Sequence, residues 1–288
     1  MAILAHRVAD YKMLVKFRLS LTVVFSSVLA FMIAGPDKID WAAMSILALG
    51  GFLVTGAANT LNQVLEKDYD KLMKRTANRP LAAGRMRVSD AVLAAGLMSL
   101  VGITLLALFN PWTAFLGTVA LMMYAFLYTP LKRISPIAVV VGAIPGALPM
   151  LIGAAAAEGR ISPLGLALFA IQFFWQFPHF WSIGWLGYED YTRAGYRLLP
   201  SRDGVRDRNT GLQSFLYALP LVPMSFMPLW LGVSGLASAI IIAILSLGYA
   251  MMGWGLYRND DRKAALKLMF YSFVYIPVTL IAIFADKI

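Results

Sequence analysis

Long apolar stretches alternate with short polar connections along the whole chain. An α-helix needs about 20 mainly apolar residues to cross the hydrocarbon core of a bilayer, and each stretch has roughly this length. The pattern predicts an all-α, polytopic membrane protein with one transmembrane domain over residues 1–288. We expect nine membrane-spanning helices, at residues 17–35, 42–65, 90–109, 112–130, 136–157, 162–187, 211–231, 236–257 and 265–285.

The composition agrees with a protein that lies in a bilayer. The chain has 288 residues, of which 60% are hydrophobic and 14% are charged, and its mean hydropathy is +0.71. These values exclude an ordinary soluble domain. The chain contains no cysteine, which excludes disulfides and thiolate metal sites.

The net charge of +10 is explained by where the cations lie. All but Lys38, Arg160 and Lys287 of the 25 Lys and Arg fall in the N-terminus and in every second connection. Because positively charged loops stay in the cytoplasm, we expect the N-terminus inside, the C-terminus outside, and the chain in the bacterial plasma (inner) membrane. The expected partner is therefore the lipid bilayer, and we expect no nucleic-acid partner.

A stripe of polar side chains marks the end of the second predicted helix. At 100° per residue, Asn62, Glu66 and Asp70 follow one another along one face, and Asn59 lies beside Asn62. Cations interleave with them or follow, namely Lys67, Lys71, Lys74, Arg75, Arg79, Arg85 and Arg87. A helix end that emerges into water explains the carboxylates but not the two asparagines within the bilayer. Carboxylates beside guanidinium groups suit a diphosphate together with a divalent cation.

The sixth predicted helix carries a second polar line. Gln172, Gln176 and His179 share a face, and Asp190 returns to that face if the helix continues. His179 lies among aromatic residues that could surround a flat ligand, and neutral imidazole is a common iron ligand. A hydrogen bond to a neighbouring helix is the alternative role for His179, and aromatic residues are common at membrane interfaces.

The fourth predicted helix ends in Lys132 and Arg133. Topology alone accounts for cations at this position. The predicted orientation also brings them to the same membrane face as the acidic connections, where a phosphate group needs cations.

Several of these stretches resemble a known family. Asn62-x3-Glu66-x3-Asp70, followed by Arg75-Thr-x2-Arg79-Pro-Leu, is similar to the signature of the UbiA-type intramembrane prenyltransferases. Glu66 stands where the family often has Asp. Further similarity, at residues 128–133, 142–153, 177–180 and 188–196, is to the subgroup that farnesylates haem. The second acidic motif of the family is shortened here to Asp190, with Ala194 at its fourth position.

The resemblance implies a nine-helix UbiA-type bundle and a reaction. A farnesyl group passes from farnesyl diphosphate to a vinyl group of haem b, with Mg²⁺ as cofactor, and a downstream haem-modifying enzyme is a candidate partner. The implied roles are metal binding by Glu66, Asp70 and Asp190; diphosphate binding by Arg75, Arg79 and Lys132; catalysis by Asn59, Asn62, Asp70 and His179; and haem binding by His179.

Two alternatives have different chemistry. A UbiA-type enzyme could prenylate a quinone or chlorophyll precursor, but the shortened second acidic motif argues against this acceptor. A haem carrier or transporter would need no catalytic site. The odd number of helices, the lack of a repeated sequence and the polar cluster at a membrane interface argue against transport.

Overall fold

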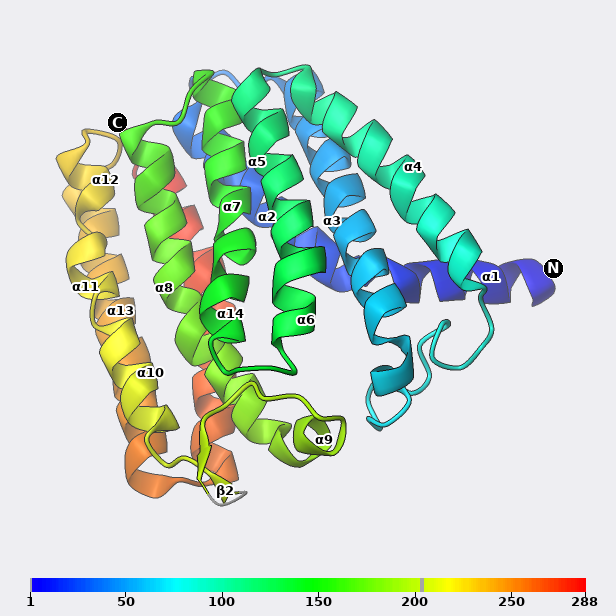
Figure 1. The fold of residues 1–288 in the computed structure, drawn as a ribbon. Helices are drawn as coiled ribbons and strands as arrows, with labels where there is room; N and C mark the ends of the chain where they lie inside the picture. Colours follow the sequence, from blue (N-terminus) through cyan, green and yellow to red (C-terminus); the bar gives the residue numbers. More distant parts are fainter. Residues whose placement is uncertain (1, 203–204) are drawn as a thin grey trace.

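A computed structural model describes residues 2–202 and 205–288 as a bundle of long helices that run side by side (Figure 1). Among the described residues, nine rods form the bundle, and two of them consist of several consecutive helical segments. They are α2 (Phe17–Ala34), α3 (Trp41–Asp70), α4 (Val88–Ala107), α5 with η1 and α6 (Pro111–Met122, Met123–Tyr128, Thr129–Leu131), α7 (Ala138–Glu158), α8 (Pro163–Leu186), α10 to α12 (Thr210–Ala218, Leu221–Met224, Met227–Trp230), α13 (Leu236–Asn259) and α14 (Arg262–Ala285).

The observed helices confirm the all-α, polytopic architecture. In the described chain, eight helices are long and apolar enough to cross a membrane. The remaining rod, α8, has 24 residues but is less apolar, because Gln172, Gln176 and His179 lie along it. It packs against α7, α10 and α14 within the bundle. Each of the nine predicted stretches therefore corresponds to one rod.

α3 is the longest helix and determines where the polar residues lie. It begins behind Asp40, whose side chain accepts a hydrogen bond from the Ala43 amide at 2.9 Å, and it continues for 30 residues. At 1.5 Å per residue it is about 45 Å long, whereas the hydrocarbon core is about 30 Å thick. Its last turns therefore reach the polar side of the membrane while they stay covered by protein.

α7 lies at the centre of the bundle, between α2, α5 and α8. Small residues allow this close packing. A Cβ atom at Gly153 would lie 2.0 Å from the backbone carbonyl oxygen of Ser27 in α2, and one at Gly146 would lie 2.0 Å from Oε1 of Gln176 in α8. Helix packing therefore requires the glycines of this proline-containing segment.

One end of the bundle carries the short elements. α9 (Tyr188–Arg193) lies near the end of α3, and a hairpin of β1 (Ser201–Arg202) and β2 (Val205–Arg206) lies below α10 and α14 at the same end of the bundle (Figure 1). Ser201 pairs with Arg206, and Arg202 pairs with Val205. α1 (Ala2–Leu14) crosses the long helices at a steep angle and projects from the bundle. The same end contains most of the charged candidate residues.

Candidate active site

The predicted polar stripe of α3 is buried. Asn59, Asn62, Glu66 and Asp70 are each 5% exposed or less, although they lie in the last three turns of a helix that ends at Asp70. Buried amides and carboxylates are costly unless they have partners. The partners come from four different parts of the chain, so the fold converges on this stripe.

Both carboxylates form ion pairs with cations. Glu66 pairs with Lys132, which follows α6, and both side chains are nearly buried. Nη1 of Arg79 donates to both carboxylate oxygens of Asp70, at 2.8 Å from Oδ1 and 2.7 Å from Oδ2. The connection after α3 folds back to allow this pair, because the Thr76 hydroxyl donates to the Asp70 carbonyl at 2.9 Å. Four of the predicted diphosphate and metal ligands thus form one cluster, namely Glu66, Asp70, Arg79 and Lys132.

The two asparagines are tied to a lysine that the sequence indicated only as a topology signal. Lys16 Nζ donates to Oδ1 of Asn62 at 2.8 Å and lies 3.4 Å from the Tyr124 hydroxyl. Asn62 in turn donates to Thr129 Oγ1 at 3.0 Å, and the Tyr124 hydroxyl donates to Oδ1 of Asn59 at 3.3 Å. These contacts join α3 to the π-helical turn η1 and to the break between α1 and α2.

Lys16 lies at that break with a left-handed backbone, φ 48°. This conformation is unusual for a residue with a side chain, and it directs the chain from α1 into α2. The sequence pattern did not indicate Lys16, Tyr124 and Thr129, because their contacts with α3 span 46 to 67 residues. The available signal for Lys16 was its position directly before a membrane span.

The cluster has an excess of positive charge. Lys16, Arg79 and Lys132 surround only two carboxylates, and the hydrogen-bond partners of Lys16 are neutral. Burial, followed by the nearby Arg79 and Lys132, lowers the pKa of Lys16 well below its usual value. An anion that enters the cluster would compensate this charge, so the arrangement is suited to an anionic ligand.

A wall of tyrosines flanks the cluster. The Tyr196 ring lies 5.4 Å from Lys132 Nζ, and burial together with Glu66 and Asp70 raises the pKa of Tyr196. Tyr196 therefore stays a neutral phenol. Tyr191 lies beside it, and its hydroxyl accepts a hydrogen bond from Nη2 of Arg75 at 3.3 Å. The predicted diphosphate ligand Arg75 thus lies on this wall.

Asp190 lies at the same end of the molecule but outside the ion-paired cluster. It lines a cavity of about 220 Å³ with Arg75 and Tyr191, and its carboxylate lies 3.3 Å from Nη1 of Arg193. The described part of the chain gathers no group of three His, Asp or Glu side chains around one point. Glu66 and Asp70 therefore lie together, whereas Asp190 lies on α9 in the cavity that also contains Arg75 and Tyr191.

Asp190 does not extend the polar line of Gln172 and Gln176, because the helix does not continue beyond Leu186. α8 ends at Leu186, and Gly187 separates it from α9. The predicted span of residues 162–187 therefore ends within one residue of the observed helix. Gln176 donates to the Ala143 carbonyl at 2.9 Å and has a packing role.

His179 lies on a different wall, between α8 and α14. Its Nδ1 is 2.7 Å from Oγ of Ser272, whose hydroxyl donates to the Met269 carbonyl at 2.5 Å. Since Ser272 uses its only hydrogen there, Nδ1 of His179 carries the hydrogen and donates it to Ser272. Nε2 is then unprotonated, which is the form that can accept a proton or bind a metal. The ring stacks on Trp175 with centroids 4.7 Å apart.

The fold and the site define an integral membrane protein with a buried, cation-rich polar cluster at one end of its helices. The chain belongs to the UbiA prenyltransferase family, whose profile matches residues 23–274. It is 43% identical to the protoheme IX farnesyltransferase of Cytophaga hutchinsonii over 99% of this chain and 100% of that protein. A protein of the same name from Christiangramia forsetii is also 43% identical, over 98% of this chain and 95% of that relative.

Solved structures share the fold. A digeranylgeranylglyceryl phosphate synthase structure has a TM-score of 0.82 at 17% identity, with 98% of each chain covered. A UbiA homolog from Archaeoglobus fulgidus bound to DMAPP and Mg²⁺ has a TM-score of 0.72 at 15% identity, covering 95% of this chain and 99% of that chain. The nine-rod bundle is therefore the UbiA fold.

Proposed function

We infer that this chain is a haem farnesyltransferase, which transfers farnesyl from farnesyl diphosphate to a vinyl group of haem b and releases diphosphate. The observation that carries the proposal is the buried cluster of Glu66 and Asp70 with three cations, placed at one end of an apolar bundle. The family and the names of its full-length relatives support the donor and the acceptor. We also propose that this end faces the cytoplasm of the bacterial plasma membrane, with the C-terminus outside.

The donor set suits Mg²⁺. Glu66 and Asp70 present carboxylate oxygens from successive turns of one helix face, and Mg²⁺ prefers oxygen ligands. We propose that these two residues hold the ion and that Asp190 contributes from α9. Bound Mg²⁺ would neutralise charge on the diphosphate and favour its departure. This binding requires Lys132 and Arg79 to leave the carboxylates and turn to the diphosphate oxygens.

The cations then act on the leaving group. As the bond between farnesyl C1 and the diphosphate oxygen breaks, negative charge grows on the diphosphate, and Lys132, Arg79 and Arg75 stabilise it. Asn59 and Asn62 hold Tyr124 and Lys16 in place at the inner side of the cluster. The apolar helices keep water from the allylic cation until a vinyl carbon attacks C1.

The acceptor needs a second set of contacts. After attack, the positive charge lies on the carbon next to the porphyrin, and water adds there with loss of a proton to give the hydroxyethylfarnesyl group. We propose that His179, with Nε2 unprotonated, faces the haem as an iron ligand or receives this proton. The farnesylated haem is a substrate for further haem modification, so an enzyme of that class is the proposed partner.

The direct test is product analysis. Purified protein with haem b, farnesyl diphosphate and Mg²⁺ should yield a farnesylated, hydrated haem by mass spectrometry, and equimolar quinone precursor should not compete. Asp70→Asn should abolish the product. Asp68→Asn is a matched control, because Asp68 lies on the same helix but has a 64% exposed side chain paired with Lys71. The absence of a farnesyl adduct with the unmodified protein would refute the proposal.

A further inference from the structure

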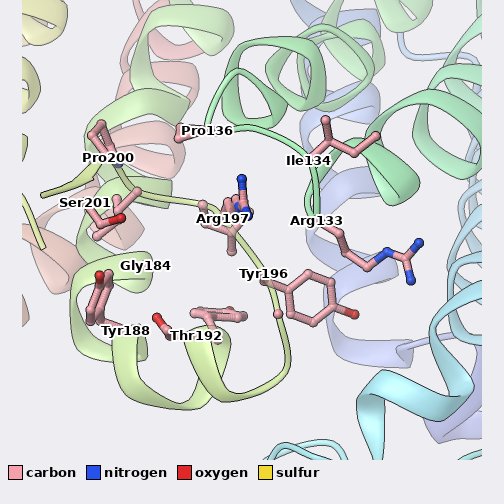
Figure 2. A pocket seen from close by; sticks show the side chains of 14 residues that line it. Arg133, Ile134, Pro136, Gly184, Tyr188, Thr192, Tyr196, Arg197, Pro200 and Ser201 are labelled. Carbon is pink, nitrogen blue, oxygen red and sulfur yellow. The ribbon is translucent and has the colours of Figure 1, made fainter. Parts of the chain in front are cut away.

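A second and larger cavity adjoins the catalytic cluster. It has a volume of about 600 Å³ and lies between the end of α8, α9 and the segments 133–136 and 195–201 (Figure 2). Small-molecule sites usually range from about 300 to 1,000 Å³. The cavity shares Tyr191 with the smaller cavity that contains Asp190 and Arg75. It is therefore large enough for a substrate and adjacent to the proposed chemistry.

The lining of this cavity suits an anion. Among the residues that the structure describes, it contains Arg133 and Arg197 and several hydroxyl groups, and no Asp, Glu or His. Arg197 lies in the middle of the lining residues in Figure 2. Its side chain is exposed, and it forms no ion pair with any other residue that the structure describes. A free guanidinium group in such a cavity can bind a carboxylate or phosphate in a bidentate manner.

The cavity is coupled to the catalytic cluster through one segment. The Arg197 amide donates to the Lys132 carbonyl at 2.7 Å, and the Tyr196 ring covers Lys132 from this side. Side chains of Tyr191 and Tyr196 separate the cavity from the cluster. Since this wall is made of side chains, rotamer changes of Tyr191 and Tyr196 would open it to a flat ligand.

Part of the cavity lining lies in stretches that resemble the haem-farnesylating subgroup. Residues 128–133 contribute Arg133, and residues 188–196 contribute Tyr188, Tyr191, Thr192 and Tyr196. A cavity lined in part by these stretches is placed to recognise the acceptor.

We propose that this cavity binds the propionate edge of haem b, with Arg197 as the principal carboxylate-binding residue. Arg133 lies at the edge, with its guanidinium carbon 4.1 Å from the Tyr69 ring centroid, and provides the second positive charge. Charged propionates cannot enter the apolar bundle without partners. Because the vinyl groups lie on the opposite edge of the porphyrin, anchored propionates direct a vinyl group across the tyrosine wall toward Glu66 and Lys132. The inference rests on the proposed function.

The test measures binding without turnover. Haem b and its dimethyl ester are each titrated, by Soret absorbance, into the full-length protein in nanodiscs that contain no farnesyl diphosphate. Arg197→Gln should weaken haem b binding about tenfold, as expected for the loss of one charge-assisted pair, and should leave binding of the uncharged ester unchanged. Arg262→Gln is the matched control, because it removes an exposed arginine at the start of α14, at the same end of the bundle.

Three results would overturn the proposal. In the first, the unmodified protein binds haem b and its dimethyl ester equally well. In the second, Arg197→Gln weakens binding of both ligands equally. In the third, Arg197→Gln weakens binding of inorganic diphosphate or of anionic lipid vesicles and leaves haem b binding unchanged, which would make the cavity a phosphate site. Unchanged thermal stability of Arg197→Gln shows that the variant is folded. Failure of the proposed function is seen separately, as the absence of a farnesyl adduct in the turnover assay.

Discussion

Replacing Lys16 by Met should separate catalysis from stability. The substitution removes a cation from the cluster and keeps a side chain of similar length. If Lys16 contacts the diphosphate in the transition state, its loss removes a charged hydrogen bond worth about 1.5–3 kcal/mol. At 1.4 kcal/mol for each factor of ten, kcat/KM for farnesyl diphosphate should fall roughly 10- to 100-fold.

Stability should change little, because two effects oppose each other. Asn62 Oδ1 loses its donor, which costs about 1–3 kcal/mol for a buried acceptor. The substitution also removes a buried cation from the folded state. Burial disfavours this cation, as the lowered pKa of Lys16 indicates, so its removal is favourable for stability. We therefore expect the melting temperature in detergent to remain within a few degrees of that of the unmodified protein.

The assay is the initial rate of farnesyl-haem formation at varied farnesyl diphosphate, beside thermal unfolding of the same samples. Lys12→Met is the control, since Lys12 is an exposed cation on α1 that makes no contact with the cluster. Activity of Lys16→Met within twofold of the unmodified protein would refute the assigned role. A loss of activity that only parallels a large loss of stability would do so as well.

Three further changes test other parts of the structure. Glu66→Asp draws the carboxylate away from Lys132 and should lower kcat roughly tenfold without abolishing turnover, as measured by product formation at saturating substrates. Gly153→Val places side-chain atoms against α2 and should lower the free energy of unfolding by more than about 3 kcal/mol, seen as lost folded protein in size-exclusion chromatography. Gly96→Val is the control and should fold, because the space around this glycine is open. The chain contains no cysteine, so single cysteines can report the orientation. Lys74→Cys should react with a membrane-impermeant maleimide only after cell lysis, whereas Lys38→Cys should react in intact cells. The reverse pattern would contradict the proposed orientation.

The membrane helices were predictable because the bilayer imposes one length scale on them. Predicted stretches such as 236–257 and 211–231 differ from the observed helices by only a few residues at their ends. The short α1 was not predicted, because a 13-residue helix outside the apolar stretches has no such length requirement. By contrast, the end of α8 was predictable, because the apolar stretch 162–187 stops within one residue of Leu186.

The candidate site was predictable where its residues share one helix. Glu66 and Asp70 lie together because helical spacing places them on one face, and Arg79 is brought to Asp70 by a short connection. The contribution of Lys16 depends on the packing of α1 and α2 against α3, which no local pattern encodes. Long-range contacts thus determined which of the many cations at this end of the bundle belong to the site.

The ion pairs of the cluster indicate how binding and catalysis are linked. Lys132 and Arg79 each hold a carboxylate that the proposed mechanism assigns to Mg²⁺. A buried carboxylate left without a partner costs several kcal/mol, so these cations keep the carboxylates charged before the substrate arrives. Glu66 and Asp70 would hold the metal, and Lys132 and Arg79, once released, would bind the diphosphate oxygens. Neither ligand alone satisfies every charge, which is why binding of farnesyl diphosphate and Mg²⁺ should be mutually dependent.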